Sequence, residues 1–196
     1  MIRFLTGGLL DKPVIRLTGR LVTLRPPTMQ DWSAWAELRS ASKNFLTPRE
    51  PEWPADALTR STFARRVKRQ RNEWNDDLAY SFISFENETG RLVGGLGLGN
   101  LRRGVAQSST LGYWVGERFA KRGYTSDAVR LVLNFAFNEL NLHRVEASCL
   151  PDNIASRRLL CKLGFIEEGL ARSYLRINGA WRDHLLFAVL KDEWQG

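Results

Sequence analysis

The sequence is poor in the residues that build disulfide frameworks and metal sites. Its 196 residues include two cysteines, Cys149 and Cys161, and two histidines, His143 and His184. Two cysteines are too few for a disulfide framework, and no paired-cysteine spacing of the zinc-site kind occurs. We therefore expect reduced thiols, a cytoplasmic protein and no bound metal.

Long hydrophobic runs are scarce as well. No stretch approaches the ~18 consecutive apolar residues of a membrane span, and Asp11 and Lys12 interrupt the N-terminus before any apolar run of signal-peptide length. The closely spaced glycines of residues 94–99 do not fit the dinucleotide pattern G-x-G-x-x-G, and no G-x-S-x-G nucleophile elbow occurs. These absences argue against a membrane protein, a Rossmann nucleotide site and serine hydrolysis.

Positive charge, by contrast, is in excess. Lys and Arg number 29 against 21 Asp and Glu, a formal net charge of +8, which favours an anionic partner: nucleic acid, membrane headgroups or a phosphorylated cofactor. The charge is densest between residues 60 and 71, where apolar residues at helical spacing predict a helix. Two interpretations stay open for it: a solvated helix face, or a patch that contacts RNA or another polyanion. Its basic residues are Arg60, Arg65, Arg66, Lys68, Arg69 and Arg71, and its apolar stripe is Phe63, Val67, Gln70 and Trp74.

The distribution of breakers and apolar residues predicts an irregular arm over residues 1–18 and one mixed α and β domain over residues 19–196. The expected order of elements is β-α-α-β-β-β-α-β-α-β-β. Strands are expected over 21–25, 78–85, 91–99, 109–115 and 143–150 and on both sides of the turn dipeptide Asn178–Gly179, and helices are expected after Thr28, from residue 60, over 123–140 and over 153–163.

The segment GERFAKRGYTSD, residues 116–127, places positive charge where a helix begins. Helices favour acidic residues in the first turn, because their free N–H groups make that end partly positive. Lys121 and Arg122 are therefore favourable there when an anion binds at the helix end. Gly123 lets the backbone approach such an anion, and the amides of residues 123–125 are expected to point at it. The alternative is an ordinary basic loop with a glycine turn.

Two segments, WVGERFAKRGYTSDAV and PDNIASRRLLCKLGF, resemble the acetyl-CoA-binding core of the GCN5-related N-acetyltransferase family. The resemblance is most specific over residues 111–169 and extends in element order over roughly 21–194. It implies an α/β (α+β) fold with a mixed, mostly antiparallel sheet of about six to seven strands flanked by about four helices. It also implies acetyl-CoA as the cosubstrate and direct transfer of its acetyl group to an amine.

The family writes its pyrophosphate loop as Q/R-x-x-G-x-G/A, and the matching positions are residues 120–125. Gly123 matches, whereas Ala120 and Thr125 depart from the pattern, which removes one side-chain contact and leaves backbone amides to hold phosphate. The resemblance further implies main-chain contacts between the end of the preceding strand and the pantetheine arm. The cofactor-binding residues implied in this way are Val115, Lys121, Arg122, Gly123, Tyr124, Thr125, Ser126, Asn153 and Ser156.

Ser156 is the residue that the resemblance assigns to catalysis, as a partner of the departing thiolate. The tyrosine that often fills this role in the family is absent, because its position holds Leu160. Ser156 lies one turn after Asn153, and this N-x-x-S pattern resembles the subgroup that acetylates the N-termini of ribosomal proteins. Asn153 is also expected to cap the helix, and a capping or exposed position is the alternative for Ser156. Cys149, which ends an apolar strand, is expected to be a buried structural thiol.

The segment YLRINGAWRDH, residues 174–184, closely resembles the closing hairpin of the ribosomal-protein-alanine N-acetyltransferases. This resemblance implies that Tyr174, Trp181 and Asp183 contact the acceptor. Hairpin packing is the alternative for Trp181, and an ion pair with a neighbouring arginine is the alternative for Asp183.

An acceptor amine must lose a proton before it attacks the thioester. At pH 7 this costs about 1 kcal/mol for an α-amino group and about 4.6 kcal/mol for a lysine side chain. No general base stands out among Glu117, Glu146, Tyr174 and Asp183, which favours an α-amine. We therefore expect acetylation of the N-terminus of a ribosomal protein, with the basic helix near ribosomal RNA. An acetyltransferase for a small amine or an antibiotic, and a non-catalytic module that binds RNA or CoA, remain as alternatives.

Overall fold

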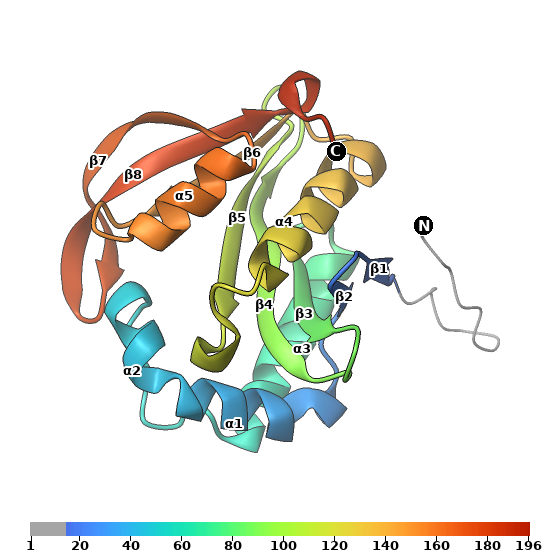
Figure 1. Cartoon of the computed structure of the whole chain (residues 1–196), viewed down its shortest axis with the longest axis vertical. Coiled ribbons are helices and arrows are strands. Elements are labelled where there is room, and N and C mark those ends of the chain that lie inside the picture. The colour runs from blue at the N-terminus through green and yellow to red at the C-terminus, as the bar shows by residue number, and fades with distance from the viewer. Residues whose placement is uncertain (1–14) are drawn as a thin grey trace.

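A mixed sheet of eight strands forms the frame of residues 15–196, the part of the chain that the computed structural model describes (Figure 1). The strands lie in the order β1-β2-β3-β4-β5-β6-β8-β7. Every neighbouring pair is antiparallel except β5 with β6, which confirms the mixed, mostly antiparallel sheet. The strands are β1 (Leu17–Thr18), β2 (Val22–Arg25), β3 (Tyr80–Glu86), β4 (Leu92–Arg102), β5 (Ser108–Val115), β6 (Arg144–Cys149), β7 (Ile166–Ile177) and β8 (Ala180–Leu190).

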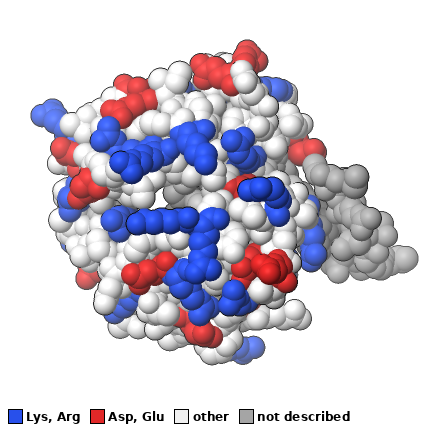
Figure 2. Space-filling model, viewed as in Figure 1, with Lys and Arg blue, Asp and Glu red and all other residues white. Residues whose placement is uncertain are grey.

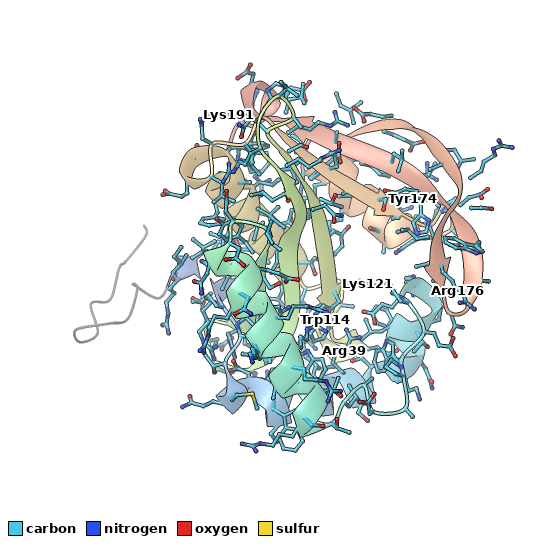
Figure 3. The ribbon with its side chains drawn as sticks, turned by 180° about the vertical axis from the view of Figure 1, so that it is seen from behind. Arg39, Trp114, Lys121, Tyr174, Arg176 and Lys191 are labelled. Carbon is cyan, nitrogen blue, oxygen red and sulfur yellow. The ribbon has the colours of Figure 1, made fainter. Side chains whose placement is uncertain are left out.

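Helices cover both faces of this sheet. α4 and α5 lie on the face turned to the viewer in Figure 1, and α3 crosses the opposite face, which Figure 3 shows from behind. Within residues 15–196, no helix has the length and apolar character needed to cross a bilayer. The helices are α1 (Trp32–Ala41), α2 (Lys43–Leu46), α3 (Arg60–Asn75), α4 (Tyr124–Asn134) and α5 (Ile154–Lys162), with 3-10 turns η1 (Met29–Asp31), η2 (Thr47–Arg49), η3 (Glu117–Phe119) and η5 (Lys191–Glu193) and a π-helical turn η4 (Phe135–Glu139).

The sheet has eight strands rather than six to seven because Leu17–Thr18 pairs with β2. The irregular arm expected over residues 1–18 is therefore wrong at its last two residues, where the buried side chain of Leu17 draws the chain onto the sheet. Residues 1–14 lie outside the described residues, so this part of the arm stays a prediction.

The helices also differ in detail from those expected. Five are present instead of about four, the additional one being the four-residue α2. The helix expected over 123–140 is regular only to Asn134 and continues as the π-helical turn η4. The amide of Leu140 donates to the carbonyl of Phe135, five residues back, and this wider turn ends the helix.

Turn signals in the sequence are confirmed where they depend on local backbone conformation. Gly164 has φ +82° and follows α5, as a left-handed helix terminator does. Asn178 and Gly179 have φ +44° and +83°, the conformation of a tight turn between β7 and β8. The two final strands are thus fixed as a hairpin, which reaches past the edge of α5 in Figure 1.

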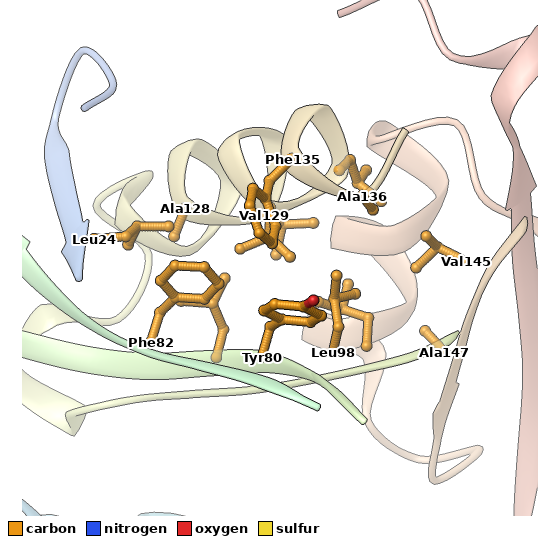
Figure 4. Packing of buried hydrophobic residues seen from close by; sticks show 14 of the residues in the cluster. Leu24, Tyr80, Phe82, Leu98, Ala128, Val129, Phe135, Ala136, Val145 and Ala147 are labelled. Atoms are coloured by element: carbon orange, nitrogen blue, oxygen red, sulfur yellow. The ribbon is translucent and has the colours of Figure 1, made fainter. Parts of the chain in front are cut away.

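α4 packs on the face of the sheet that β3 and β4 build (Figure 4). Tyr80, Phe82 and Leu98 point to this face, since residues in register on neighbouring strands share a face. Phe135 packs edge-on against Phe82 with 5.7 Å between ring centroids, and Val129 is fully buried beside them. Each such side chain contributes roughly 1.5–3 kcal/mol by its burial, so this contact fixes α4 on the sheet.

The first turn of α4 is tied to the strands beneath it by two carboxylates. Asp127 accepts from the amides of Leu21 and Val22, at 2.7 and 3.0 Å. The hydroxyl of Tyr124 donates to buried Glu86 of β3 at 2.7 Å. Hydrogen bonds from Thr89 and then from Tyr124 and Arg91 lower the pKa of Glu86 to about 2, so this carboxylate is an ionised anchor for the helix start.

Replacing Glu86 by Gln should make the folded state less sensitive to acid. Because the folded-state pKa of Glu86 is about 2 rather than the usual 4.5, its contribution to stability is complete above about pH 4.5 and disappears as the pH falls toward 2. We expect the unfolding temperature to drop less steeply for Glu86→Gln than for the wild type between about pH 5 and about pH 2.5. Thermal unfolding followed by circular dichroism measures this slope. Glu88→Gln, an exposed acid of the same turn, is the control; equal slopes for Glu86→Gln and the wild type would contradict the assignment.

Candidate functional site

β5 and β6 separate near the middle of the sheet. They pair in parallel over residues 108–110 and 144–146 and then diverge (Figure 1). From residue 111 to Val115, β5 stays paired with β4, whereas no strand of residues 15–196 pairs with its other edge. An unpaired strand edge offers its main-chain groups to an extended ligand. Val115 lies at the end of this free edge, and it is the residue for which the family resemblance implies a contact with the pantetheine arm.

The loop between β5 and α4 holds a run of main-chain amides without acceptors. In the described part of the chain the amides of residues 121–126 donate to no acceptor, and the first helical bond joins Asp127 to Gly123. Lys121 and Arg122 are exposed beside these amides. Figure 2 shows lysine and arginine side chains gathered around a hollow on this face of the molecule. Free amides at a helix start together with nearby cations form a site that suits an anion.

Gly123 occupies the bend of this loop for a steric reason. Its φ is +84°, a left-handed conformation that side-chain-bearing residues rarely adopt. A Cβ at this position would lie 3.2 Å from Cδ1 of Leu21, so a larger residue would also press on the turn between β1 and β2. The glycine turn expected from the sequence is therefore present, and it caps α4.

The residues expected to bind the cofactor around the start of α4 lie together. Tyr124 and Thr125 line one small cavity with Val115 and Tyr113. The side chain of Tyr124 is engaged with the protein itself through Glu86, which leaves its amide for a ligand. Ser126 follows in the same turn and is half-buried.

A tyrosine–serine pair joins β5 to α5 across the divergence of the strands. The phenol oxygen of Tyr113 lies 2.6 Å from the hydroxyl oxygen of Ser156. Ser156 is buried in the first turn of α5, where its amide donates to Oδ1 of Asn153 at 3.2 Å, so Asn153 is the expected helix cap. Burial raises the pKa of Tyr113 to about 12, and the phenol therefore keeps its proton at neutral pH.

Tyr113 is the residue that sequence reasoning missed. It lies two positions before Val115, and alternation along a strand places both side chains on the same face, which is the signal that points to it. Its partner Ser156 is 43 residues away in the chain, so no local pattern reveals the pair. Leu160, which stands where the family often has a tyrosine, is fully buried in the core.

Cys149 lies close to this pair at the end of β6. Its side chain is buried, and burial raises the pKa of its thiol, although a hydrogen bond with Ser156 acts in the opposite direction. A thiol with a raised pKa is a poor nucleophile near neutral pH. The buried thiol expected from the sequence is confirmed.

The three residues expected at the acceptor all lie on the β7–β8 hairpin. Trp181 is 66% exposed, and the ring of Tyr174 packs edge-on against buried His184 with 5.8 Å between centroids. Asp183 accepts from the amide of Ser173 at 2.7 Å, at an irregularity of β7. Its carboxylate is held by the hairpin itself rather than by the arginine partner considered above.

The remaining candidate general bases are Glu146, Glu117 and Tyr174. Glu146 accepts from Arg102 and Arg144 at 2.8 and 3.0 Å, in the part of β6 that is still paired with β5. Glu117 is exposed in the turn η3. Figure 3 places Tyr174 across the opening of the sheet from Trp114 and Lys121. No free carboxylate of the described residues thus faces Tyr113 at hydrogen-bond distance.

A cavity of about 710 Å³ lies on the other face of the sheet, between α3 and the strands. Glycines of neighbouring strands form the floor of this cavity, on its sheet side, and leave space below α3. At Gly95 that space is taken by the indole of Trp114, since an added Cβ would come within 2.6 Å of its Nε1. Trp114 and Tyr113 belong to its lining, so the cavity extends to the opening between β5 and β6. The glycines of the floor are Gly95, Gly97, Gly99 and Gly112.

The basic residues of α3 do not share one surface. Arg65 is exposed and pairs with Asp56 at 3.0 Å, whereas Arg66 lines the cavity. Both interpretations of this helix, the solvated face and the patch for RNA, assumed a common exposed face, and Arg66 departs from it. The apolar stripe is confirmed by the burial of Phe63 and Val67.

Comparison with known proteins agrees with this geometry. The family model "Acetyltransferase (GNAT) domain" matches residues 21–166. Probable N-acetyltransferase YjcK of Bacillus subtilis (strain 168) is 33% identical over 177 residues, which cover 90% of this chain and 98% of that protein. The ribosomal protein uS5-alanine N-acetyltransferase of Escherichia coli (strain K12) is 29% identical over 184 residues, covering 93% of this chain and 94% of that protein.

The solved structures show the same relationship. Mycobacterium smegmatis RimJ, in a complex with CoA-disulfide, superposes with a TM-score of 0.86 and 34% sequence identity, over 93% of this chain and 89% of that one. The family model covers most of the chain, and the diverging strands, the glycine turn and the helix start all lie inside its match. The chain therefore belongs to the GNAT family of acetyltransferases.

Proposed function

We propose that this N-acetyltransferase transfers the acetyl group of acetyl-CoA to the N-terminal α-amino group of a polypeptide, with a ribosomal protein as the acceptor. The observation that carries the proposal is the Tyr113–Ser156 pair, which holds a hydroxyl proton beside the free edge of β5. The names of two relatives support the acceptor: the E. coli enzyme acts on alanine of ribosomal protein uS5, and the M. smegmatis structure is a RimJ with bound CoA-disulfide.

The chain's residues fit acetyl-CoA, which supplies the acetyl thioester when bound. The amides of residues 121–126, together with Lys121 and Arg122, suit its diphosphate, because they combine free donors with positive charge. The unpaired edge that ends at Val115 suits its extended amide-bearing arm. Asn153 caps α5 beside this path and keeps Ser156 in position.

Tyr113 and Ser156 are the groups that we assign to the departing sulfur. A thiolate leaving group gains negative charge as the thioester breaks, and a hydroxyl donor nearby stabilises that charge. Because burial raises the pKa of Tyr113 to about 12, its Oη keeps a proton to donate through the whole neutral range. Ser156, 2.6 Å away, accepts from or donates to this phenol and is the second hydroxyl of the pair.

The acceptor end favours an amine that loses its proton easily. Deprotonation at pH 7 costs about 1 kcal/mol for an α-amine against about 4.6 kcal/mol for a lysine. Of the four candidate bases that the sequence singled out, Glu146 accepts from two arginines and Asp183 accepts from the amide of Ser173, so neither is a free carboxylate. Such a site suits an α-amine, in a cytoplasmic setting where ribosomal proteins are made. Contact of α3 with ribosomal RNA stays a prediction that would involve its exposed residues only.

Incubating the purified chain with acetyl-CoA and peptides should reveal the acceptor. We expect acetylation at the α-amine of peptides that copy ribosomal-protein N-termini, and none at an internal lysine of the same peptide, because of the difference in deprotonation cost. Mass spectrometry of the products locates the acetyl group. N-terminally blocked peptides are the control. Modification of a small amine or an antibiotic with untouched peptides would reverse the assignment, and CoA binding without turnover on any acceptor would indicate a non-catalytic module.

Replacing Tyr113 by Phe should slow the chemical step. Loss of a positioned acid commonly costs on the order of a hundredfold or more, so we expect kcat to fall by about that factor with KM for acetyl-CoA little changed. Steady-state assays of thiol release measure both constants. Tyr80→Phe is the matched control, because Tyr80 is also a tyrosine with a pKa raised to about 12 but donates to Asp77, away from the cleft.

The pair also predicts non-additivity. The loss caused by Tyr113→Phe with Ser156→Ala should be smaller than the sum of the two single losses in free energy, because the hydroxyls act as a unit. Full activity of Tyr113→Phe, or strictly additive losses, would contradict the assignment of this pair.

Replacing Gly123 by Glu should weaken CoA binding. A negative side chain at the helix start repels the diphosphate, and the Cβ itself meets Leu21. We expect the Kd for CoA, measured by calorimetry, to rise by about tenfold or more. Gly90→Glu is the matched control, since Gly90 also has a positive φ, +69°, but nothing lies within 4 Å of its added Cβ. An equal rise for both variants would show that backbone strain, and not the anion site, is responsible.

A further inference from the structure

Arg66 is a cation without a partner in the cavity between α3 and the sheet. Its guanidinium forms no hydrogen bond and no ion pair with any residue in the described part, 15–196. The side chain is half-buried and lies over the ring of Trp35, with 5.6 Å between Cζ and the ring centroid. A cation–π contact of this kind compensates only part of the cost of removing a charge from water.

The acidic groups near Arg66 are already paired with other residues. Glu50 accepts from both terminal nitrogens of Arg39, and also from Nε1 of Trp53 at 2.8 Å. Glu73 pairs with Arg69 at 3.4 Å. The guanidinium groups of Arg39, Arg66 and Arg69 thus outnumber the two carboxylates near the cavity. Because each carboxylate pairs with another arginine, Arg66 is the cation of this group that remains unpaired within residues 15–196.

The surroundings disfavour the positive charge of Arg66. Burial is the largest cause that lowers its pKa, the positive charges of Arg39 and Arg69 lower it further, and Glu50 and Glu73 oppose them. A second polar group near the cavity also has no partner: Nε of buried Arg39 forms no hydrogen bond with any of the described residues. The cavity is thus built with more positive charge than its own acids neutralise. An anion inside it would remove this imbalance.

The shape of the cavity suits a polypeptide rather than a compact ion. Two glycines of its floor leave open space along β4 and β5, since nothing lies within 4 Å of a Cβ added at Gly99 or Gly112. Main chain without side chains lets a second backbone approach closely, as an extended polypeptide requires.

Tyr113 and Trp114 of β5 belong to the lining, so the cavity reaches the strand that carries the reacting centre. The register Phe82–Leu96–Tyr113 turns the Tyr113 side chain to the α4 face, and an acceptor in the cavity meets it through the opening between β5 and β6. α4, whose start suits the diphosphate of CoA, covers the opposite face of the sheet. An anion at Arg66 therefore belongs to the acceptor.

We propose that Arg66 binds a carboxylate of the acceptor and selects polypeptides that carry Asp or Glu a few residues after their N-terminal amine. The inference rests on the proposed function and deepens it, because it names a feature of the substrate that the amine alone does not give. Arg66 is a specificity-determining residue in this role: its guanidinium pairs with the acidic side chain in the cavity while the terminal amine reaches Tyr113.

Matched peptides test this selection. One Glu is moved along an otherwise neutral peptide from the second position onward, and each peptide is compared with its Gln counterpart by the ratio of kcat/KM in a thiol-release assay. With the wild-type chain we expect a Glu-over-Gln ratio of about ten- to a hundredfold at the best position, the range of a charge-assisted hydrogen bond. Arg66→Gln should bring this ratio to about one, and Arg66→Glu should favour Lys over Gln at the same position.

Arg65→Gln is the control, because Arg65 is an exposed arginine one position away that pairs with Asp56 outside the cavity. It should keep both the wild-type activity and the wild-type ratio. Equal kcat/KM for Glu and Gln peptides with the wild-type chain, or a preference that survives in Arg66→Gln, would overturn the inference. If peptides are not acetylated at all and a small amine is, the proposed function fails; the inference is then decided by the same ratio for amines that carry a carboxylate or its amide.

A second measurement needs no acceptor. Because an unpartnered cation costs stability, Arg66→Met should raise the unfolding temperature of the free chain by about 2–4 °C. A lower unfolding temperature would show that Arg66 supports the fold rather than the acceptor site, and would count against the inference.

Discussion

The divergence of β5 and β6 is the constraint on which the site depends. β5 is held by β4 along its whole length, and β6 is held by β8 along its whole length. The two half-sheets therefore share only three register pairs, over residues 108–110 and 144–146. Beyond these pairs each half-sheet follows its own twist. The main-chain N–H and C=O groups on this edge of β5 therefore have no neighbouring strand in the described part of the chain to hydrogen-bond with, as they would in a continuous sheet.

Two side-chain and main-chain contacts span the opening that results. Tyr113 and Ser156 join β5 to α5 close to the divergence. Further out, the amide of Asn178, at the tip of the β7–β8 hairpin, donates to the carbonyl of Glu50 at 2.9 Å, and Glu50 is in turn held by Arg39. The opening is thus bounded at both ends by fixed contacts. A frame of this kind suits a direct transfer, whose rate arises mainly from holding an amine and a thioester in one orientation.

Sequence alone gives the parts of this arrangement that local conformation decides. Gly123 and Gly164 have the positive φ that their positions predict, and Asn153 caps α5. The parts that depend on register or on distant partners escape it. Tyr113 pairs with a residue 43 positions away, and Asp183 accepts from the amide of Ser173 at an irregularity of β7, so no local pattern reveals either contact. Contact of Asp183 with the acceptor stays a prediction.

Arg66 shows why charge composition is a poor guide to a charged site. Six basic residues within one helical segment cannot share a face, since each residue turns the helix by about 100°. Arg66 follows Phe63 by three positions, so it lies beside the buried stripe, and Arg65 points away toward Asp56. The basic residues of α3 therefore include both Arg65, which is exposed and pairs with Asp56, and Arg66, which lines the cavity and has no acidic partner among the described residues. A charge inside a cavity discriminates between ligands better than an exposed one. A ligand that leaves Arg66 unpaired in the cavity incurs a large desolvation cost, whereas an unpaired arginine at the surface is hydrated by water at little cost.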